Sequence, residues 1–324
     1  MCTAISITNG DHYFGRTLDL EYSLNESIVI TPRHFPFNFR HKNTVKDHYA
    51  IIGTAIVCDE YPLYFDAVNE AGLGMAGLKY SPPAQHFTLT PYMNNVETFE
   101  LIPWILSTCQ TTVQARQKIE RTHILSNNFN RQFSAAPLHW IIADKNSTIT
   151  VEMSPLGIKI YDNPIGVLTN DPSFEYQMIN LNNYINLTAY PPQSRFGESI
   201  KLIPYSKGMG ALGLPGDVSS VSRFVRASFT KLNSVCPPCE EDNITQFFNI
   251  LDVVKQVRGC VRLENDKYEI TVYTSCYNTD KGIYYYTTYN NHQINAIDMS
   301  KEKLDSNALI DFKMNEHQNI AWQN

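Results

Sequence analysis

The sequence has no apolar run that approaches the roughly 20 residues needed to cross a membrane. Its longest apolar runs, residues 101–106 and 138–143, are the size of core segments. A basic surplus is also absent, because 26 Lys and Arg stand against 32 Asp and Glu and give a formal net charge of −6. Nucleic-acid backbones bind to basic surfaces. We therefore expect neither membrane insertion nor nucleic-acid binding.

Low-complexity stretches, internal repeats and long linkers are missing as well. Charged residues make up only 18% and apolar residues 43% of the 324 positions, which excludes disorder as a description of the whole chain. A chain of this length forms one large domain or two ordinary ones, and nothing in it marks a boundary. We expect a single domain over residues 1–324.

The N-terminus lacks a basic leader and an apolar segment before a cleavage site, so we expect no secretory signal. The seven cysteines are odd in number and widely scattered. This usage is typical of reduced thiols in a cytoplasmic protein. Cys236 and Cys239 are spaced like half of a zinc or redox site, but a structural zinc needs four ligands and no matching second pair exists. The sequence therefore predicts no metal site.

Alternating apolar and polar residues predict strands at both ends of the chain and in its middle. The expected strands cover residues 2–8, 12–16, 27–31, 49–57, 72–78, 138–143, 148–153, 157–161, 166–169, 268–275, 282–289 and 293–297. Helical periodicity replaces this alternation in two blocks. The expected helices lie in residues 95–125, with a second helix from 112, and in 174–184, 223–232 and 244–257. Hairpins that flank helical blocks indicate an α+β architecture of antiparallel sheets covered by helices.

Turn and capping residues refine this pattern. The Asn9-Gly10 turn predicts a hairpin between the first two strands. We expect Asn95 to cap the first helix and Pro103 to kink it. Residues 234–243 are expected to form a loose, exposed loop.

Two motifs have better structural than functional explanations. Residues 72–77 fit the Gly-x-Gly-x-x-Gly pattern of dinucleotide sites, but the glycines must then open a helix, and Pro82 and Pro83 follow too closely for one. Close packing of small residues on a strand is favoured instead. His139 lies in an apolar strand pattern, so we expect a hydrogen-bonded core histidine rather than the partner of a catalytic cysteine.

Cys2 is the strongest candidate for chemistry. Removal of the initiator methionine would expose it with a free α-amine, whose pKa near ~7.7–8.0 suits a proton acceptor. The reactive form of cysteine is the thiolate, and the amine can take the thiol proton without a histidine. The predicted hairpin brings Arg16 and Asp19 back past Cys2. A guanidinium there would favour the thiolate, and a carboxylate would orient the protonated amine.

The whole chain resembles the choloylglycine hydrolase family, which comprises bile salt hydrolases and penicillin V acylases. The residues that carry the resemblance are Met1-Cys2-Thr3, Phe14-Gly15-Arg16-x-x-Asp19, Asn69-Glu70-x-Gly72-Leu73-Gly74, Gly166-Val167-Leu168-Thr169-Asn170, Gly213-Leu214-Pro215-Gly216-Asp217, Ser222-Arg223-Phe224, Tyr273-Thr274-Ser275-Cys276, residues 281–289 and Asn295-Ala296-Ile297-Asp298-Met299. The sequence is most similar to bile salt hydrolases of gut Gram-positive bacteria.

This resemblance implies a four-layer αββα fold of N-terminal-nucleophile hydrolases, a homotetramer, and no metal or organic cofactor. It implies that Cys2 is nucleophile and base, that Arg16 supports the thiolate and that Asp19 holds the α-amine. Asn170 would donate to the oxyanion, and Arg223 would stabilise the site from behind. The implied reaction is hydrolysis of the amide bond of glycine- or taurine-conjugated bile acids.

Position 79 departs from the family pattern, because bile salt hydrolases usually carry Asn and penicillin V acylases Tyr where this chain has Lys79. If its backbone N–H contributes to the oxyanion hole, Lys is tolerable, and its ammonium could meet the anionic end of the conjugate. If a side-chain donor is required, its loss would cost roughly 3–4 kcal/mol of transition-state stabilisation. A solvated lysine at the rim of the pocket is an equally good interpretation.

A steroid acyl group requires a broad apolar mouth. We expect it to be formed by residues 127–136 and by Leu18, Tyr22, Leu24, Leu63 and Phe65. Core packing would explain any one of these side chains equally well. Two alternatives to bile salt hydrolysis are a penicillin V acylase or related acyl-amide hydrolase and a catalytically silent ligand-binding homologue.

Overall fold

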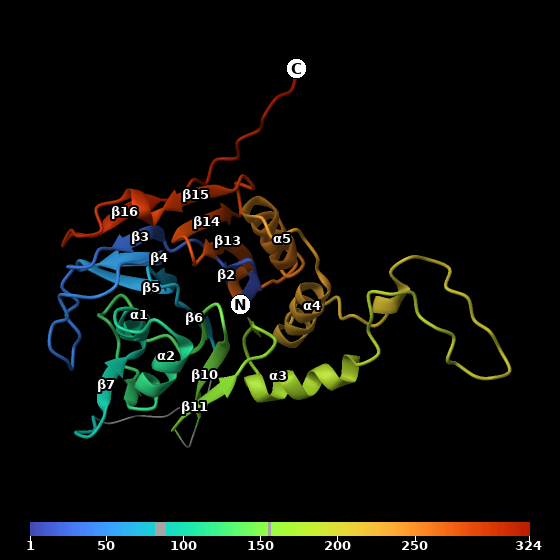
Figure 1. Ribbon diagram of the computed structural model, residues 1–324, viewed down its shortest axis with the longest axis horizontal. Coiled ribbons are helices and arrows are strands. Elements are labelled where there is room, and N and C mark those ends of the chain that lie inside the picture. The colour runs from blue at the N-terminus through green and yellow to red at the C-terminus, as the bar shows by residue number, and fades with distance from the viewer. Residues whose placement is uncertain (82–88, 155–156) are drawn as a thin grey trace.

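Two antiparallel sheets lie face to face in the computed structural model, which describes residues 1–81, 89–154 and 157–324 (Figure 1). The six-stranded sheet has the order β12 (Val167–Leu168), β1 (Cys2–Asn9), β2 (Asp11–Leu20), β13 (Ile270–Asn278), β14 (Ile283–Thr288) and β15 (Asn295–Asp298). The eight-stranded sheet has the order β11 (Gly157–Asp162), β10 (Thr148–Ser154), β9 (Leu138–Ala143), β6 (Gly74–Lys79), β5 (Tyr61–Asn69), β4 (Ile51–Cys58), β3 (Ser27–Thr31) and β16 (Ile310–Lys313).

Helices cover both outer faces (Figure 1). The helices α4 (Ser220–Asn233) and α5 (Glu240–Asp252) pack on the six-stranded sheet, and α1 (Leu101–Leu106) and α2 (Thr112–Ile119) pack on the eight-stranded sheet. The shorter α3 (Phe174–Asn180) contacts α4. The expected α+β fold of four layers, αββα, is confirmed.

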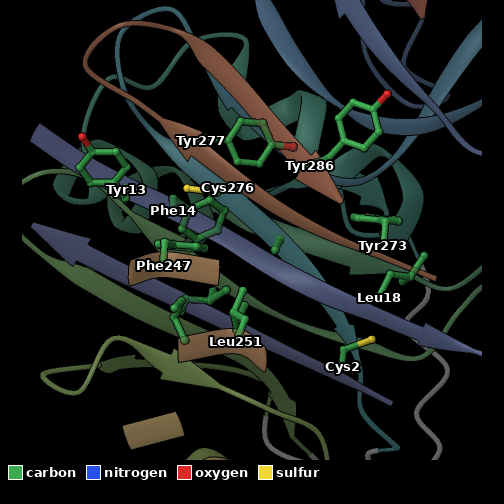
Figure 2. Close-up of a cluster of buried hydrophobic side chains, with 14 of the residues drawn as sticks. Cys2, Tyr13, Phe14, Leu18, Phe247, Leu251, Tyr273, Cys276, Tyr277 and Tyr286 are labelled. Carbon is green, nitrogen blue, oxygen red and sulfur yellow. The ribbon is translucent and has the colours of Figure 1, made fainter. Parts of the chain in front are cut away.

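Apolar side chains fill each space between the layers. One cluster joins Phe247 and Leu251 of α5 to both sheets, and Figure 2 shows that it extends along β2 and β13 to Leu18, Tyr273 and Cys2. A second cluster lies under α1 and α2, with Trp140 at its centre. The two sheets therefore have their hydrophobic core between them, and Cys2 lies at one end of it.

The hairpin of β1 and β2 forms as the sequence predicts. Its turn contains Gly10, whose φ of +76° glycine adopts without strain. The register places Cys2 opposite Leu18 and Ala4 opposite Arg16. Arg16 and Asp19 therefore return past Cys2 in the middle of a buried sheet.

The region expected to be helical between residues 95 and 125 differs from the prediction. Asn95 belongs to a short strand, β7 (Asn94–Glu97), and its side chain bonds to the backbone of Thr90 instead of capping a helix. A 3-10 turn (Thr98–Glu100) leads into α1, where Pro103 lies in the first turn, so its missing N–H breaks no helical bond and no kink results.

Other boundaries also differ from the prediction. The second helix ends at Ile119, and β8 (Thr122–Leu125) pairs in parallel with β7. The loop expected at residues 234–243 is shorter, because α5 begins at Glu240. The strands β5 and β16 were not predicted at all.

The glycine motif and His139 are structural, as predicted. A Cβ atom on Gly74 of β6 would lie 2.7 Å from the Phe14 ring, so only glycine lets β2 approach β6 this closely. The ring of His139 is buried between Glu152, 3.0 Å from Nδ1, and the Thr169 carbonyl, 2.8 Å from Nε2. The prolines at positions 82 and 83 lie outside the described residues. Within the described ranges, every helix is too short or too polar to cross a membrane.

Candidate active site

Cys2 lies at the start of β1, at the floor of a cavity between the sheets. Its side chain is only 4% exposed, and Figure 2 shows the sulfur beside Leu18 and below Tyr273. Its backbone N–H donates to the Asn170 side-chain oxygen over 2.8 Å. The position thus combines a buried thiol with a fixed backbone nitrogen.

Arg16 extends from β2 across the gap between the two sheets. Its Nη1 atom donates to the Gly77 carbonyl at 2.5 Å and to the Phe65 carbonyl at 3.3 Å. Its Nη2 atom is buried and has no partner in the described part of the chain. Burial alone would lower the pKa of Arg16, but the Cys2 sulfur, Tyr273 and Asp66 raise it, so the guanidinium stays charged. Arg16 lines the same cavity as Cys2 and therefore brings a buried N–H donor that has no other partner in the described part of the chain.

Asp19 is buried directly behind the N-terminal residue. Its carboxylate accepts hydrogen bonds from Thr271 at 2.7 Å and Thr17 at 3.3 Å, and burial raises its pKa. Two hydrogen bonds join its backbone to Met1. The N–H of Asp19 donates to the Met1 carbonyl at 2.9 Å, and the Met1 ammonium donates to the Asp19 carbonyl at 2.7 Å. The ammonium also forms an ion pair with Glu269, and burial lowers its pKa.

Asn170 and Arg223 complete the polar wall beside Cys2. Asn170 follows β12 and donates from Nδ2 to the Lys79 carbonyl at 2.7 Å. Arg223 of α4 donates to the Cys2 carbonyl at 2.5 Å, to Thr3 Oγ1 at 2.7 Å and to Asn170 Oδ1 at 2.7 Å. Burial lowers the pKa of Arg223, and its electrostatic interaction with Asp19 opposes this shift.

Lys79 ends β6 with its side chain exposed at the cavity. It pairs with Leu138, and the next residue, Tyr80, donates its N–H to Pro137 at 3.0 Å. Hydrogen-bonded and non-bonded pairs alternate in an antiparallel ladder, so both the N–H and the carbonyl of Lys79 point away from β9. The carbonyl reaches Asn170, and the N–H lies on the same side of the strand.

The cavity above Cys2 has a volume of about 370 Å³ and mostly apolar walls. Four of the five expected binding residues, Leu18, Leu24, Leu63 and Phe65, line it together with residues 129 and 133–136 of the expected loop. Tyr22 lies outside this lining, because its ring is 52% exposed and stacks with Lys267, whose Nζ is 5.3 Å from the ring centroid. The remaining lining residues are Cys2, Arg16, Leu20, Ile56, Tyr64, Gly77, Lys79, Thr98, Phe99, Ile102, Pro137, Leu138 and Trp140.

Sequence reasoning missed the wall formed by Phe99, Ile102 and Trp140. Ile102 and Trp140 fit the core patterns of a helix and a strand, and both belong to the core under α1 and α2. The sequence pattern therefore explains them as core residues and does not indicate that they also line the cavity. Sequence reasoning also missed Glu269, which lies in an irregular segment before β13.

The described residues contain no group of three or more His, Cys, Asp or Glu side chains that could hold a metal. Cys236 and Cys239 are unbridged thiols at the start of α5, where Cys239 Sγ lies 2.9 Å from the Asp242 carboxylate. The carboxylate raises the pKa of Cys239. The polar groups gathered around Cys2 are therefore the chemically distinctive cluster that the geometry offers.

The αββα layering is that of the N-terminal-nucleophile hydrolase fold. The chain belongs to the choloylglycine hydrolase family of linear amide C–N hydrolases, whose family model matches residues 2–312. It is 47% identical to the bile salt hydrolase/transferase of Lactiplantibacillus plantarum over 97% of each chain. It is 36% identical to the bile salt hydrolase/transferase of Clostridium perfringens over the full length of both.

Solved structures agree with this assignment. A mutant of the conjugated bile acid hydrolase from Clostridium perfringens superposes with a TM-score of 0.91 at 34% identity, covering all of both chains. The penicillin V acylase from Agrobacterium tumefaciens has a TM-score of 0.73 at 20% identity and covers 97% of this chain and 91% of its own. The second likeness concerns the fold alone.

Proposed function

We propose that this protein is a conjugated bile salt hydrolase, which cleaves the amide bond between a bile acid and glycine or taurine. The observation that carries the proposal is the Cys2 thiol at the floor of an apolar cavity that Arg16, whose Nη2 is buried and unpartnered among the described residues, also lines. The full-length similarity to relatives named bile salt hydrolases supports the choice of substrate.

Removal of Met1 makes the Cys2 nitrogen the α-amine of the chain. This amine takes the thiol proton, and the thiolate attacks the acyl carbonyl while the positive charge of Arg16 stabilises the sulfur anion. The collapsing tetrahedral intermediate expels the amine of glycine or taurine, which leaves with the proton from the α-amine. Water then hydrolyses the thioester, with the same amine as base. We assign the orientation of the protonated amine to Asn170 Oδ1, which accepts the N–H of Cys2, and to the buried Asp19 carboxylate.

In the proposed mechanism, the oxyanion of the tetrahedral intermediate lies between Asn170 and Lys79. One N–H of the Asn170 amide is bound to the Lys79 carbonyl, which leaves the second for the substrate oxygen. The backbone N–H of Lys79 points to the same side of β6 and serves as the second donor. Arg223 holds the amide in this orientation. With the backbone as donor, Lys in place of Asn at position 79 is compatible with catalysis.

The cavity suits a rigid apolar acyl group. Its volume of about 370 Å³ is within the range of small-ligand sites, and leucine and phenylalanine side chains dominate its walls. Lys79 also lines it, and its backbone is joined to that of Cys2 through the side chain of Asn170. In this arrangement the steroid body fills the apolar part, and the carboxylate or sulfonate of the conjugate lies toward the Lys79 ammonium.

A hydrolysis assay with glycocholate, taurocholate and penicillin V tests the proposal. Each substrate is incubated with the wild type, with Cys2→Ser and with Cys260→Ser, a control at an exposed cysteine. We expect amino-acid release from both bile salts by the wild type and Cys260→Ser, and a loss of roughly a thousandfold or more in Cys2→Ser. Faster turnover of penicillin V would instead identify a penicillin V acylase. Retained Met1 in intact-mass spectra, with no amine released from any conjugate, would identify a silent binding homologue.

An extension that cannot be cleaved ahead of Cys2 tests the role of the amine. Such a chain keeps every side chain of the site but has no free amine at Cys2, so turnover should vanish. Full activity of this blocked chain would exclude the mechanism.

The assembly and location of the protein are also part of the proposal. Residues 185–212 form an arm that extends away from the sheets, and large apolar side chains along it, among them Phe196, Ile203 and Tyr205, are exposed (Figure 1). Exposed apolar surface of this extent is typical of an interaction site. We propose that further copies of the chain cover it in a homotetramer, that residues 1–324 form one domain, and that the protein is cytoplasmic.

A further inference from the structure

Asp66 of β5 is a buried carboxylate outside the set of residues to which the proposed mechanism gives a role. It points from the eight-stranded sheet toward β13, which presents three hydroxyl groups on one face at every second residue. Ser275 donates to it over 2.9 Å, Tyr277 donates over 2.8 Å, and Tyr273 forms a still shorter hydrogen bond. One carboxylate therefore joins the two sheets at the centre of the molecule.

Packing alone does not account for a carboxylate at this place. Burial of a charge is costly unless a partner compensates it, and burial indeed raises the pKa of Asp66, opposed by the positive charge of Arg16. Arg16 itself is wholly buried. The two groups therefore compensate each other within the core.

Arg16 and Asp66 are linked without a direct hydrogen bond between their side chains. Ser275 Oγ accepts the backbone N–H of Arg16 at 3.2 Å and donates to Asp66. Arg16 Nη1 also donates to the carbonyl of Phe65, the residue before Asp66. In the described part of the chain, the hydrogen bonds of the guanidinium go to backbone carbonyls and not to a carboxylate.

This arrangement has a consequence for Cys2. A carboxylate in direct contact with Arg16 would occupy its free Nη2 and neutralise it. Asp66 is linked to Arg16 through Ser275, so it compensates the buried charge and fixes the strand that carries Arg16, while Nη2 stays without a partner in the described part of the chain.

We propose that Asp66 is a positioning residue for catalysis, which acts on Cys2 only through Arg16. This inference rests on the proposed function, because it concerns the same thiol. Asp66 does not touch substrate, and its hydroxyl partners serve to hold it in place.

A double-mutant cycle between Asp66→Asn and Arg16→Met tests whether one residue acts through the other. We expect Asp66→Asn to lower kcat for glycocholate by about tenfold or more in the wild-type background, and by less than about twofold when Arg16 is already Met. The matched control is Tyr284→Phe, which removes another buried bond between the sheets, from Tyr284 to Thr54 at 2.7 Å, and should leave kcat within about twofold.

Equal losses in both backgrounds would overturn the inference, because a purely structural role lowers activity whether or not Arg16 is present. A loss in Tyr284→Phe as large as that in Asp66→Asn would overturn it too. A second measurement applies the same double-mutant cycle to the rate at which iodoacetamide alkylates Cys2. Peptide mapping measures this rate, and no substrate is needed. A wild type that cleaves no conjugate refutes the proposed function, while the alkylation cycle still decides the role of Asp66.

Discussion

The guanidinium of Arg223 donates to the side-chain oxygen of Asn170 over 2.7 Å, and the same oxygen accepts the backbone N–H of Cys2. Two donors on one oxygen fix which way the amide is turned, so the nitrogen of Asn170 must face Lys79. A residue on helix α4 thereby sets the orientation of the amide that is hydrogen-bonded to Cys2.

Asn170→Asp is expected to inactivate the enzyme without unfolding it. The substitution keeps the size of the side chain but replaces the donating nitrogen with an oxygen that faces the Lys79 carbonyl. We expect kcat for glycocholate to fall by roughly 10²–10³, the usual effect of losing one oxyanion donor. Steady-state kinetics beside the exposed control Asn183→Asp measure this, and an unchanged kcat would remove Asn170 from the oxyanion hole.

Lys79→Asn is expected to change the preference between glycine and taurine conjugates. Lys79 is exposed and lines the same cavity as Cys2, whereas the proposed oxyanion donor is the backbone, which the substitution retains. We expect the ratio of kcat/KM for glycocholate to kcat/KM for taurocholate to change by about threefold or more. The kcat of the variant for its better substrate should stay within about threefold of the wild-type value. An unaltered ratio would show that Lys79 is a solvated side chain at the rim.

His12 should make the protein less stable in mild acid. Its ring is buried between Ser6 and Thr279, and burial lowers its pKa from 6.5 to about 4. Below pH 6.5 the unfolded chain therefore binds a proton that the folded chain refuses, so stability falls as the pH drops from 6.5 toward 4. The difference amounts to about 3 kcal/mol at most.

Urea unfolding of the wild type and His12→Gln at several pH values measures this effect. Asp144, Asp280, Lys145 and Lys231 act on the same ring, but they remain in both proteins and cancel in the comparison. The free energy of unfolding of the wild type should fall more steeply with acid than that of the variant. Parallel curves would contradict the prediction.

Gly74→Ala should destabilise the packing of the two sheets. The added Cβ would lie 2.7 Å from the ring of Phe14, so either the ring or a strand must move. We expect a loss of about 1–3 kcal/mol in the free energy of unfolding. Gly197→Ala is the matched control, because a Cβ there meets nothing within 4 Å, and a similar loss in both variants would argue against the close approach.

Charges on the arm should break the proposed tetramer. Ile203→Asp together with Tyr205→Asp places two charges among exposed apolar side chains, which opposes burial of the arm by another copy. We expect light scattering to give a smaller mass for this variant than for the wild type. Val113→Asp, an exposed apolar position on α2, should leave the mass unchanged. Identical masses for all three would place any interface elsewhere.

Local sequence patterns predicted the structure correctly where residues close together in the chain determine it. The turn at Asn9-Gly10 sets the register of β1 and β2, and this register alone brings Arg16 and Asp19 back to Cys2. They did not predict the strands β7 and β8, whose pairing partners lie far away in the sequence. The pairing of Asn94 with Thr122 turns both ends of an expected helical block into strands, and no local pattern reveals it.

The binding cavity shows the same limit. Leu18 and Leu63 could be named as apolar side chains for the mouth that a steroid group requires, whereas the wall at Phe99 depends on how the residues before and in α1 pack on the sheet. Tyr22 could not be separated from these residues by its type, since only its position next to Lys267 shows that it faces outward.

The turn at Gly10 touches no part of the cavity and lies eight residues from Cys2, roughly 25 Å along an extended strand. It nevertheless decides which side chains surround the sulfur. One residue inserted there would slip the ladder by a single rung, and every side chain of β2 would exchange its two faces. A change in length at the far end of the β1–β2 hairpin is therefore expected to disrupt the chemistry at its other end.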